Sequence, residues 1–93
     1  MSDLMSKIAP ETITITLKLF AIYQEALGVP EKTMTLPIGT TAGEVRDRLI
    51  TEHPTLSPWR DLTRFGINLQ FVTADTPLQE GDELVLIPPV SGG

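Results

Sequence analysis

Apolar and polar residues alternate without interruption from Thr12 to Leu19, and this pattern predicts a β-strand with one buried face. Isoleucine and leucine occupy the odd positions, whereas threonine and lysine occupy the even ones. Phe20 then falls in the even phase, so a large apolar side chain stands where the pattern predicts solvent. A second alternating run, Lys32–Leu36, ends at Pro37 and predicts an antiparallel partner for the first strand.

The main helix is predicted to begin at Thr41, where Thr41-Ala42-Gly43-Glu44 fits a capping box, and to end near His53, before Pro54. Four apolar residues at helical spacing form the expected buried stripe: Ala42, Val45, Leu49 and Ile50. Four charged residues are expected on the solvent side: Arg46, Asp47, Arg48 and Glu52. Shorter helical pieces are expected at 21–27, where Gly28 stops the helix, and at 55–65.

Two further strands are predicted, one from Ile67 to Val72 and one from Glu83 to Ile87. The last strand has apolar residues at four consecutive positions, which is typical of a central strand. One helix with a single apolar stripe packs most simply across a sheet. The sequence therefore predicts an α+β fold, a mixed sheet of four to five strands with one main helix packed across it.

Composition limits the possible partners of this 93-residue chain, which has a net charge of −5 and no cysteine. The negative charge argues against nucleic acid and suits a basic partner, or simply keeps a small domain in solution. No run approaches the roughly 18 apolar residues of a membrane span, and the start lacks the apolar segment of a signal peptide. A cytoplasmic location is expected. Residues 1–11 show no periodicity and are expected to form a flexible extension.

No set of side chains predicts that this chain catalyses a reaction by itself. The single histidine, His53, lies at a helix end, where the helix dipole favours it. The carboxylates Glu80, Asp82 and Glu83 surround a glycine turn, but their spacing does not match a calcium loop, and no metal is expected. Ser91 has no histidine near it in the sequence.

The sequence Pro88-Pro89-Val90-Ser91-Gly92-Gly93, here called the C-terminal tail, follows the last strand directly. The prolines cannot continue a sheet ladder and stiffen the chain, whereas the glycines leave it narrow. Six extended residues reach roughly 20 Å, which suits insertion into a narrow tunnel on another protein. The alternative is a frayed chain end.

An exposed apolar patch is expected beside this tail. Val85 and Ile87 share the face of the last strand that lies opposite to Leu84 and Leu86. Neighbouring strands would then bring Phe20, Ile87 and Phe71 together on the open side of the sheet. An exposed apolar patch of this kind usually marks an interface. In the alternative interpretation, the irregular segment near Trp59 folds over the patch and covers it.

Taken together, these features resemble the β-grasp, ubiquitin-like sulfur carriers, and among them the small subunits of molybdopterin synthase. The resemblance covers residues 12–93 and is most specific in Gly81-Asp82-Glu83, followed by an apolar strand and the C-terminal tail. Further matching residues are Phe20-Ala21, Gly28, Asn68 and Thr76-Pro77-Leu78. The resemblance implies a β-grasp domain at 12–87 and an extended tail at 88–93.

The resemblance also implies the chemistry. An E1-like adenylyltransferase would use ATP and magnesium to convert the Gly93 carboxylate into an acyl-adenylate, and a sulfur donor would then form a thiocarboxylate. The tail would enter the large synthase subunit, in a heterotetramer, and give its sulfur to a pyranopterin precursor. Gly93 would carry the reacting group, with Gly92 allowing close approach, and no cofactor would be bound by this chain. The residues expected to bind partners are Phe20, Phe71, Ile87, Pro88, Pro89, Val90 and Ser91.

Three other functions remain open at this stage. The chain can be a sulfur carrier for thiamine or cysteine synthesis, although thiamine carriers usually lack much of the segment at 55–65. It can be a ubiquitin-like modifier that is joined to lysines through Gly93. It can also be a passive β-grasp interaction domain.

Overall fold

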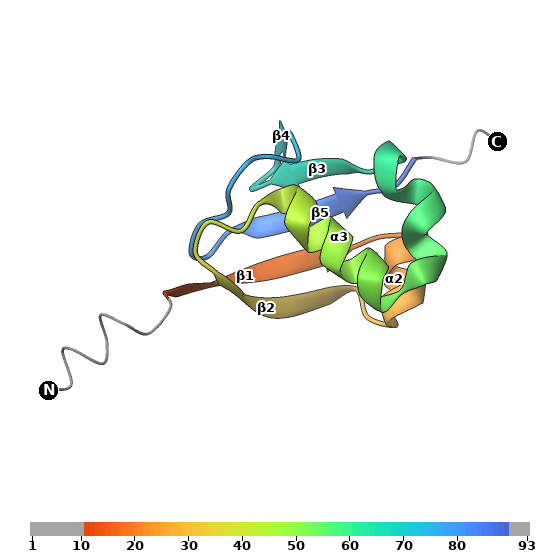
Figure 1. Ribbon diagram of the computed structural model, residues 1–93, viewed down its shortest axis with the longest axis horizontal. Coiled ribbons are helices and arrows are strands. Elements are labelled where there is room, and N and C mark those ends of the chain that lie inside the picture. Colours follow the sequence, from red (N-terminus) through yellow and green to blue (C-terminus); the bar gives the residue numbers. More distant parts are fainter. Residues whose placement is uncertain (1–10, 90–93) are drawn as a thin grey trace, which may run out of the picture.

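The computed structural model describes residues 11–89 (Figure 1). The predicted N-terminal extension, except for Glu11, and the tail residues Val90, Ser91, Gly92 and Gly93 lie outside the described residues. The elements in chain order are β1 (Thr12–Leu19), α2 (Ile22–Leu27), β2 (Glu31–Pro37), α3 (Ala42–Glu52), the 3₁₀ helix η1 (Pro54–Leu62), β3 (Arg64–Ile67), β4 (Gln70–Val72) and β5 (Glu83–Ile87).

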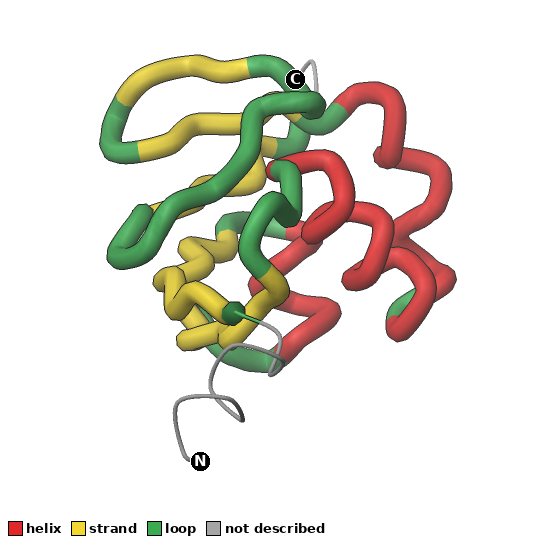
Figure 2. The backbone as a smooth tube through the Cα atoms, turned by 60° about the vertical axis from the view of Figure 1, so that its left-hand side comes forward, coloured by secondary structure: helices red, strands yellow, loops and turns green. Residues whose placement is uncertain are grey.

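The strands form one five-stranded mixed sheet in the order β2-β1-β5-β3-β4. β5 runs parallel to β1 and antiparallel to β3, so the last strand lies in the centre, as its apolar sequence predicted. The helical segments gather on one side of this sheet (Figure 2). The predicted α+β, β-grasp fold is confirmed, and among residues 11–89 no helix covers the other side of the sheet.

The core lies between the sheet and α3. The odd-numbered side chains of β1 are buried, as the alternation predicted, and they pack with Leu84 and Leu86 of β5. Tyr23 of α2 is fully buried as well, and its hydroxyl lies 2.6 Å from the Thr63 hydroxyl. This hydrogen bond joins α2 to the end of η1 across 40 residues of sequence.

The predicted capping box of α3 is present. The Thr41 hydroxyl accepts from the Glu44 backbone N–H at 3.2 Å, and the Glu44 carboxylate accepts from the Thr41 N–H at 2.8 Å. Ala42, Val45 and Leu49 are buried, as expected from the apolar stripe. These two hydrogen bonds satisfy N–H groups that have no partner inside the helix, which fixes where α3 begins.

The prediction that Arg46 faces solvent is wrong, because only 8% of this residue is exposed. Its guanidinium lies 5.3 Å from the centre of the Phe65 ring and donates to the Asp47 carboxylate at 2.9 Å. A long arginine side chain can bury its stem against apolar surface while its charged end keeps an aromatic face and a carboxylate as partners. The helical pattern placed Arg46 on the solvent side because of its charge, and it gave no sign of the packing against Phe65.

The predicted single strand from Ile67 to Val72 is also wrong, because the chain turns back at Asn68 and Leu69 to form the β3–β4 hairpin. Both residues have positive φ, 49° and 71°, which is the signature of a type I′ turn. The second position usually needs glycine, and without glycine the turn has a weak sequence signal. Left-handed backbone costs a residue with a Cβ about 1 kcal/mol or more.

Asn68 fastens this hairpin to the start of β5. Its side chain donates to the Asp82 carboxylate and accepts from the Glu83 N–H, each at 3.0 Å, and its own N–H donates to the Glu83 carbonyl. Asn68→Ala removes the two side-chain hydrogen bonds and places alanine at positive φ. We expect the free energy of unfolding to fall by about 1–3 kcal/mol in chemical denaturation.

The matched variant for this prediction is Asn68→Gly, which loses the same hydrogen bonds but suits positive φ. Its free energy of unfolding should lie between those of the wild type and Asn68→Ala. A wild-type value for Asn68→Ala would show that the side chain does not hold the hairpin.

Among residues 11–89, no helix has the length and apolar character needed to cross a membrane.

Candidate functional site

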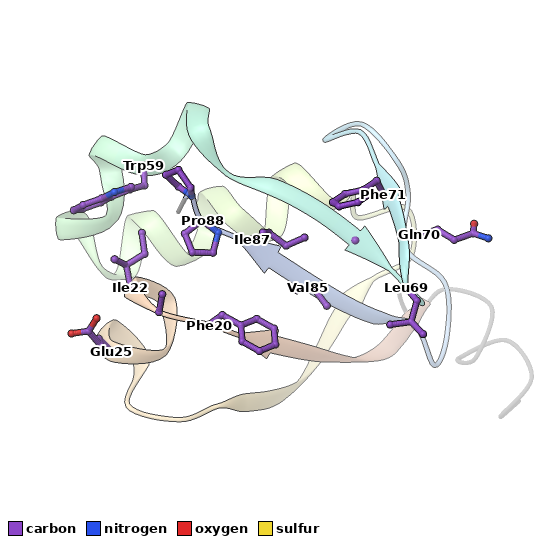
Figure 3. A pocket seen from close by; sticks show the side chains of 13 residues that line it. Phe20, Ile22, Glu25, Trp59, Leu69, Gln70, Phe71, Val85, Ile87 and Pro88 are labelled. Carbon is purple, nitrogen blue, oxygen red and sulfur yellow. The ribbon is translucent and has the colours of Figure 1, made fainter. Parts of the chain in front are cut away.

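The open face of the sheet carries the apolar patch that the sequence predicted. The parallel register pairs Leu19 with Leu86, so the chain places Phe20 beside Ile87 where β1 ends. Half of Phe20 is exposed, 52%, and Phe71 on β4 is 78% exposed. Val85 and Ile87 of β5 lie between them on the same face (Figure 3).

These side chains line a shallow groove of about 930 Å³, here called the open-face groove. Its thirteen residues are Phe20, Ala21, Ile22, Glu25, Trp59, Gly66, Leu69, Gln70, Phe71, Val85, Ile87, Pro88 and Pro89. Apolar side chains predominate, and Glu25 is the single charged residue among the thirteen. A groove with this lining favours an apolar segment of a partner protein.

Gly66 lies in the floor of the groove, next to Val85 and Phe71 in the strand register. Its missing side chain leaves a gap in the row that these residues form across the sheet. A Cβ added at this position would be 3.7 Å from the Gln70 carbonyl oxygen and 3.9 Å from Ile87 and Val85 side-chain atoms. The glycine lets the groove extend down to the sheet backbone. β3 itself does not require glycine here, because an added Cβ would make only ordinary van der Waals contacts.

Trp59 on η1 forms the end of the groove where Pro88 also lies (Figure 3). The Thr63 hydroxyl donates to the Trp59 carbonyl at 2.8 Å, and Thr63 in turn contacts Tyr23, so the backbone at Trp59 is fixed from the core. Trp59 borders the patch and leaves Phe20 and Phe71 exposed. The alternative interpretation, in which the Trp59 segment covers the patch, is therefore wrong for the described residues.

A charged cluster fixes η1 against α3. Arg60 donates two hydrogen bonds to the Asp47 carboxylate, at 3.0 and 3.2 Å, and Arg46 donates to the same group. Partial burial disfavours the charged form of Asp47, but the hydrogen bonds from the two arginines outweigh it, and the pKa of Asp47 lies below its ordinary value. Asp47 therefore stays ionised, and its hydrogen bonds to Arg60 link α3 to η1 one residue after Trp59.

Burial raises the pKa of Tyr23 above its ordinary value, although the hydrogen bond to Thr63 works in the opposite direction. The phenol is therefore neutral at physiological pH. It can share a hydrogen bond with the Thr63 hydroxyl without placing a charge in the core.

Pro88, the first residue of the tail, lies at the Trp59 end of the groove. Of the predicted partner-binding residues, the structure brings Phe20, Phe71, Ile87, Pro88 and Pro89 together in one groove. Their predicted role in binding is a separate matter and stays a prediction. Val90, Ser91, Gly92 and Gly93, which follow Pro89 in the sequence, lie outside the described residues.

Several groove residues were missed by the sequence analysis. Trp59 was considered only as part of an alternative cover for the patch, and Ile22 and Leu69 were not predicted to lie at the site. The one available signal for Leu69 was its position after Asn68, since asparagine tolerates positive φ and so marks a turn. The position of Ile22 depends on the short helix α2, whose face could not be determined from six residues.

The carboxylates around Gly81 have structural partners. Glu80 accepts from the Thr14 N–H at 3.0 Å, and Asp82 accepts from the Gln79 N–H at 2.8 Å as well as from Asn68. They close the turn that leads into β5. Within the described range 11–89, no group of three or more acidic or histidine side chains is arranged to hold a metal ion.

The fold and its open-face groove define a ubiquitin-like protein of the β-grasp class. The chain belongs to the ThiS family, whose model matches residues 17–93. The molybdopterin synthase sulfur carrier subunit of Arabidopsis thaliana is 35% identical over 82 residues, which cover 88% of this chain and 85% of the relative.

Solved structures share this fold. The crystal structure of SAMP1 from Haloferax volcanii is 31% identical, with a TM-score of 0.71, and the match covers 86% of this chain and 99% of that chain. The protein–protein complex of subunits 1 and 2 of molybdopterin-converting factor from Helicobacter pylori contains a chain with the same fold. That chain is 23% identical, with a TM-score of 0.54, and the match covers 87% of this chain and 100% of that one.

Proposed function

We propose that this protein is the sulfur carrier of a molybdopterin synthase and acts in molybdenum cofactor biosynthesis. The observation that carries the proposal is the 35% identity to a molybdopterin synthase sulfur carrier subunit, which extends over 88% of the chain. The open-face groove supports it, because an apolar surface borders the two prolines that begin the tail. The main partner is the large subunit of the synthase, in a heterotetramer, and the location is the cytoplasm.

The proposed chemistry takes place on the carboxylate of Gly93. A carboxylate is a poor electrophile, so an E1-like adenylyltransferase activates it with ATP and magnesium. One carboxylate oxygen attacks the α-phosphate, pyrophosphate leaves, and an acyl-adenylate is formed. Hydrosulfide, released by a sulfur donor, then attacks the acyl carbon, the bond from that carbon to the AMP oxygen breaks, and a thiocarboxylate remains while AMP leaves. This chain would bind neither ATP nor magnesium itself.

Docking and sulfur transfer are connected by the position of the groove. A large subunit that covers Phe20, Ile87 and Phe71 lies next to Pro88 and Pro89 and can therefore receive the residues that follow. The prolines restrict the chain before it binds, so less conformational entropy is lost when the tail enters a tunnel. The large subunit would supply the pocket for the pyranopterin precursor, which accepts the sulfur.

A second candidate is a ubiquitin-like modifier that is linked to lysines through the same carboxylate. The 31% identity to SAMP1 of Haloferax volcanii, which belongs to the small archaeal modifier proteins, favours it. Both candidates need the same activated carboxylate. They differ in what accepts the acyl group: a sulfur nucleophile in the carrier and a lysine amine in the modifier.

Mass spectrometry of the C-terminal peptide tests the proposal. We expect protein made in cells with the sulfur machinery to carry one sulfur in place of one oxygen at Gly93. Conversion in vitro should require ATP, magnesium and the adenylyltransferase. The loaded protein should bind a large molybdopterin synthase subunit in preference to a thiazole synthase.

Three results would contradict this assignment. Isopeptide-linked species of higher mass, without the sulfur exchange, would favour the modifier. Sulfur loading combined with binding to the thiazole synthase would assign the carrier to thiamine synthesis instead. If the peptide retains its ordinary carboxylate under all these conditions, the protein is not a sulfur carrier.

A further inference from the structure

Leu69 has two features that are unfavourable for the isolated domain. Its side chain is 91% exposed, more than any other large apolar residue in the described range. Its φ is 71°, in the left-handed region that favours glycine and disfavours a branched apolar residue. Nothing in the β3–β4 turn requires leucine, because Asn68 supplies the hydrogen bonds that hold the hairpin.

Leu69 also lines one end of the open-face groove. It lines the groove together with Phe71 at the β4 end, whereas Trp59 and Pro88 lie at the other end (Figure 3). A partner that receives the tail and covers the groove therefore reaches Leu69. The docking surface proposed above continues to this residue without interruption.

Backbone strain elsewhere in the domain supports this interpretation. The structure has three non-glycine residues with positive φ among the residues it describes, and two of them, Ala21 and Leu69, line the groove. Ala21 follows Phe20, where the chain leaves β1. Strained backbone persists at functional sites when it presents a side chain that is needed there, and an observed outlier is a reason to look for that function.

We propose that Leu69 is an anchor residue that inserts into an apolar pocket of the large synthase subunit. This inference rests on the proposed function, because the occupant of the groove is that subunit. A few residues that become fully buried in a partner's pocket carry most of the binding energy of an interface. The cost of holding Leu69 exposed and strained is then offset only in the complex.

The variant Leu69→Gly tests the proposal, because it should change stability and binding in opposite directions. Glycine suits a φ of 71°, so the midpoint of chemical denaturation should move to higher denaturant concentration. Affinity for the large subunit, measured by calorimetry, should fall about tenfold or more. If Leu69 served only the fold, Leu69→Gly would instead move the midpoint of chemical denaturation to lower denaturant concentration.

Two further variants complete the experiment. Leu69→Met keeps an apolar side chain at the same backbone position and should bind like the wild type. Ile38→Ala removes a side chain of similar character that is 60% exposed and lies outside the groove, and it should leave the affinity unchanged.

The possible outcomes separate the inference from the proposed function. If Leu69→Gly lowers stability, or raises it without weakening binding, Leu69 is not an anchor, and the proposed function stands. If the wild type fails to bind the large subunit at all, the proposed function fails, and the inference fails with it. If sedimentation shows a wild-type dimer that Leu69→Gly abolishes, the pocket belongs to a second copy, which also overturns the inference.

Discussion

Deletion of Gly93 is expected to abolish sulfur transfer to the pyranopterin precursor without changing the thermal unfolding midpoint. The remaining carboxylate would be on Gly92, one residue, or about 3.3–3.6 Å, short of its position in the partner's active site. Catalysis tolerates such a displacement poorly, because reacting atoms must lie close together and be oriented correctly. We expect at least a hundredfold loss in a single-turnover assay with the large subunit.

Binding supplies the control for this deletion. Phe20, Phe71, Ile87 and Pro88 line the open-face groove, and the shortened protein keeps all four, so it should still bind the large subunit through the groove. A bulky substitution, Gly92→Leu, should give the same loss of transfer by widening the tail. If either variant lowers the unfolding midpoint by several degrees, the tail is part of the fold, and the proposed role of Gly93 is wrong.

Phe20→Ser is expected to weaken binding to the large subunit about tenfold or more while it changes the free energy of unfolding by less than about 1 kcal/mol. The reason is that Phe20 is 52% exposed and lies beside Ile87 in the groove, so most of its burial would occur in the complex. Titration calorimetry and urea denaturation of the same preparations measure the two quantities.

Leu62→Ser is the matched comparison for Phe20, because Leu62 is 58% exposed and lies outside the groove. Its affinity for the large subunit should remain that of the wild type. A large loss of stability in Phe20→Ser would place Phe20 in the core. Equal weakening of binding by both variants would show that the groove is not the docking surface.

Much of this fold could be predicted because the strand pattern has a strict period of two. The alternation in β1 placed its odd residues in the core and left Phe20 on the opposite face. The capping residues Thr41 and Glu44 fixed the start of α3 through local hydrogen bonds. The central position of β5 followed from its continuous apolar run.

Features that depend on distant residues could not be predicted in this way. Arg46 is buried because Phe65 and Asp47 lie against it, and only tertiary packing brings Phe65 there. Trp59 is positioned through Thr63 by Tyr23, which is 40 residues from Thr63 in the sequence. The groove was therefore predicted from its strand residues, whereas its end at Trp59 and its hairpin at Leu69 were missed.

The central position of β5 also affects the order of events during synthesis. β1 and β3 are not neighbours in the sheet, and each pairs with β5, so the sheet cannot close before residues 83–87 have left the ribosome. Long-range strand pairing of this kind is also a slow part of folding. The residues that follow β5 leave the ribosome later still, and β5 must be paired in the sheet before they can be presented to a partner beside the groove. An enzyme that recognises both the groove and the tail would thereby select chains that have already folded.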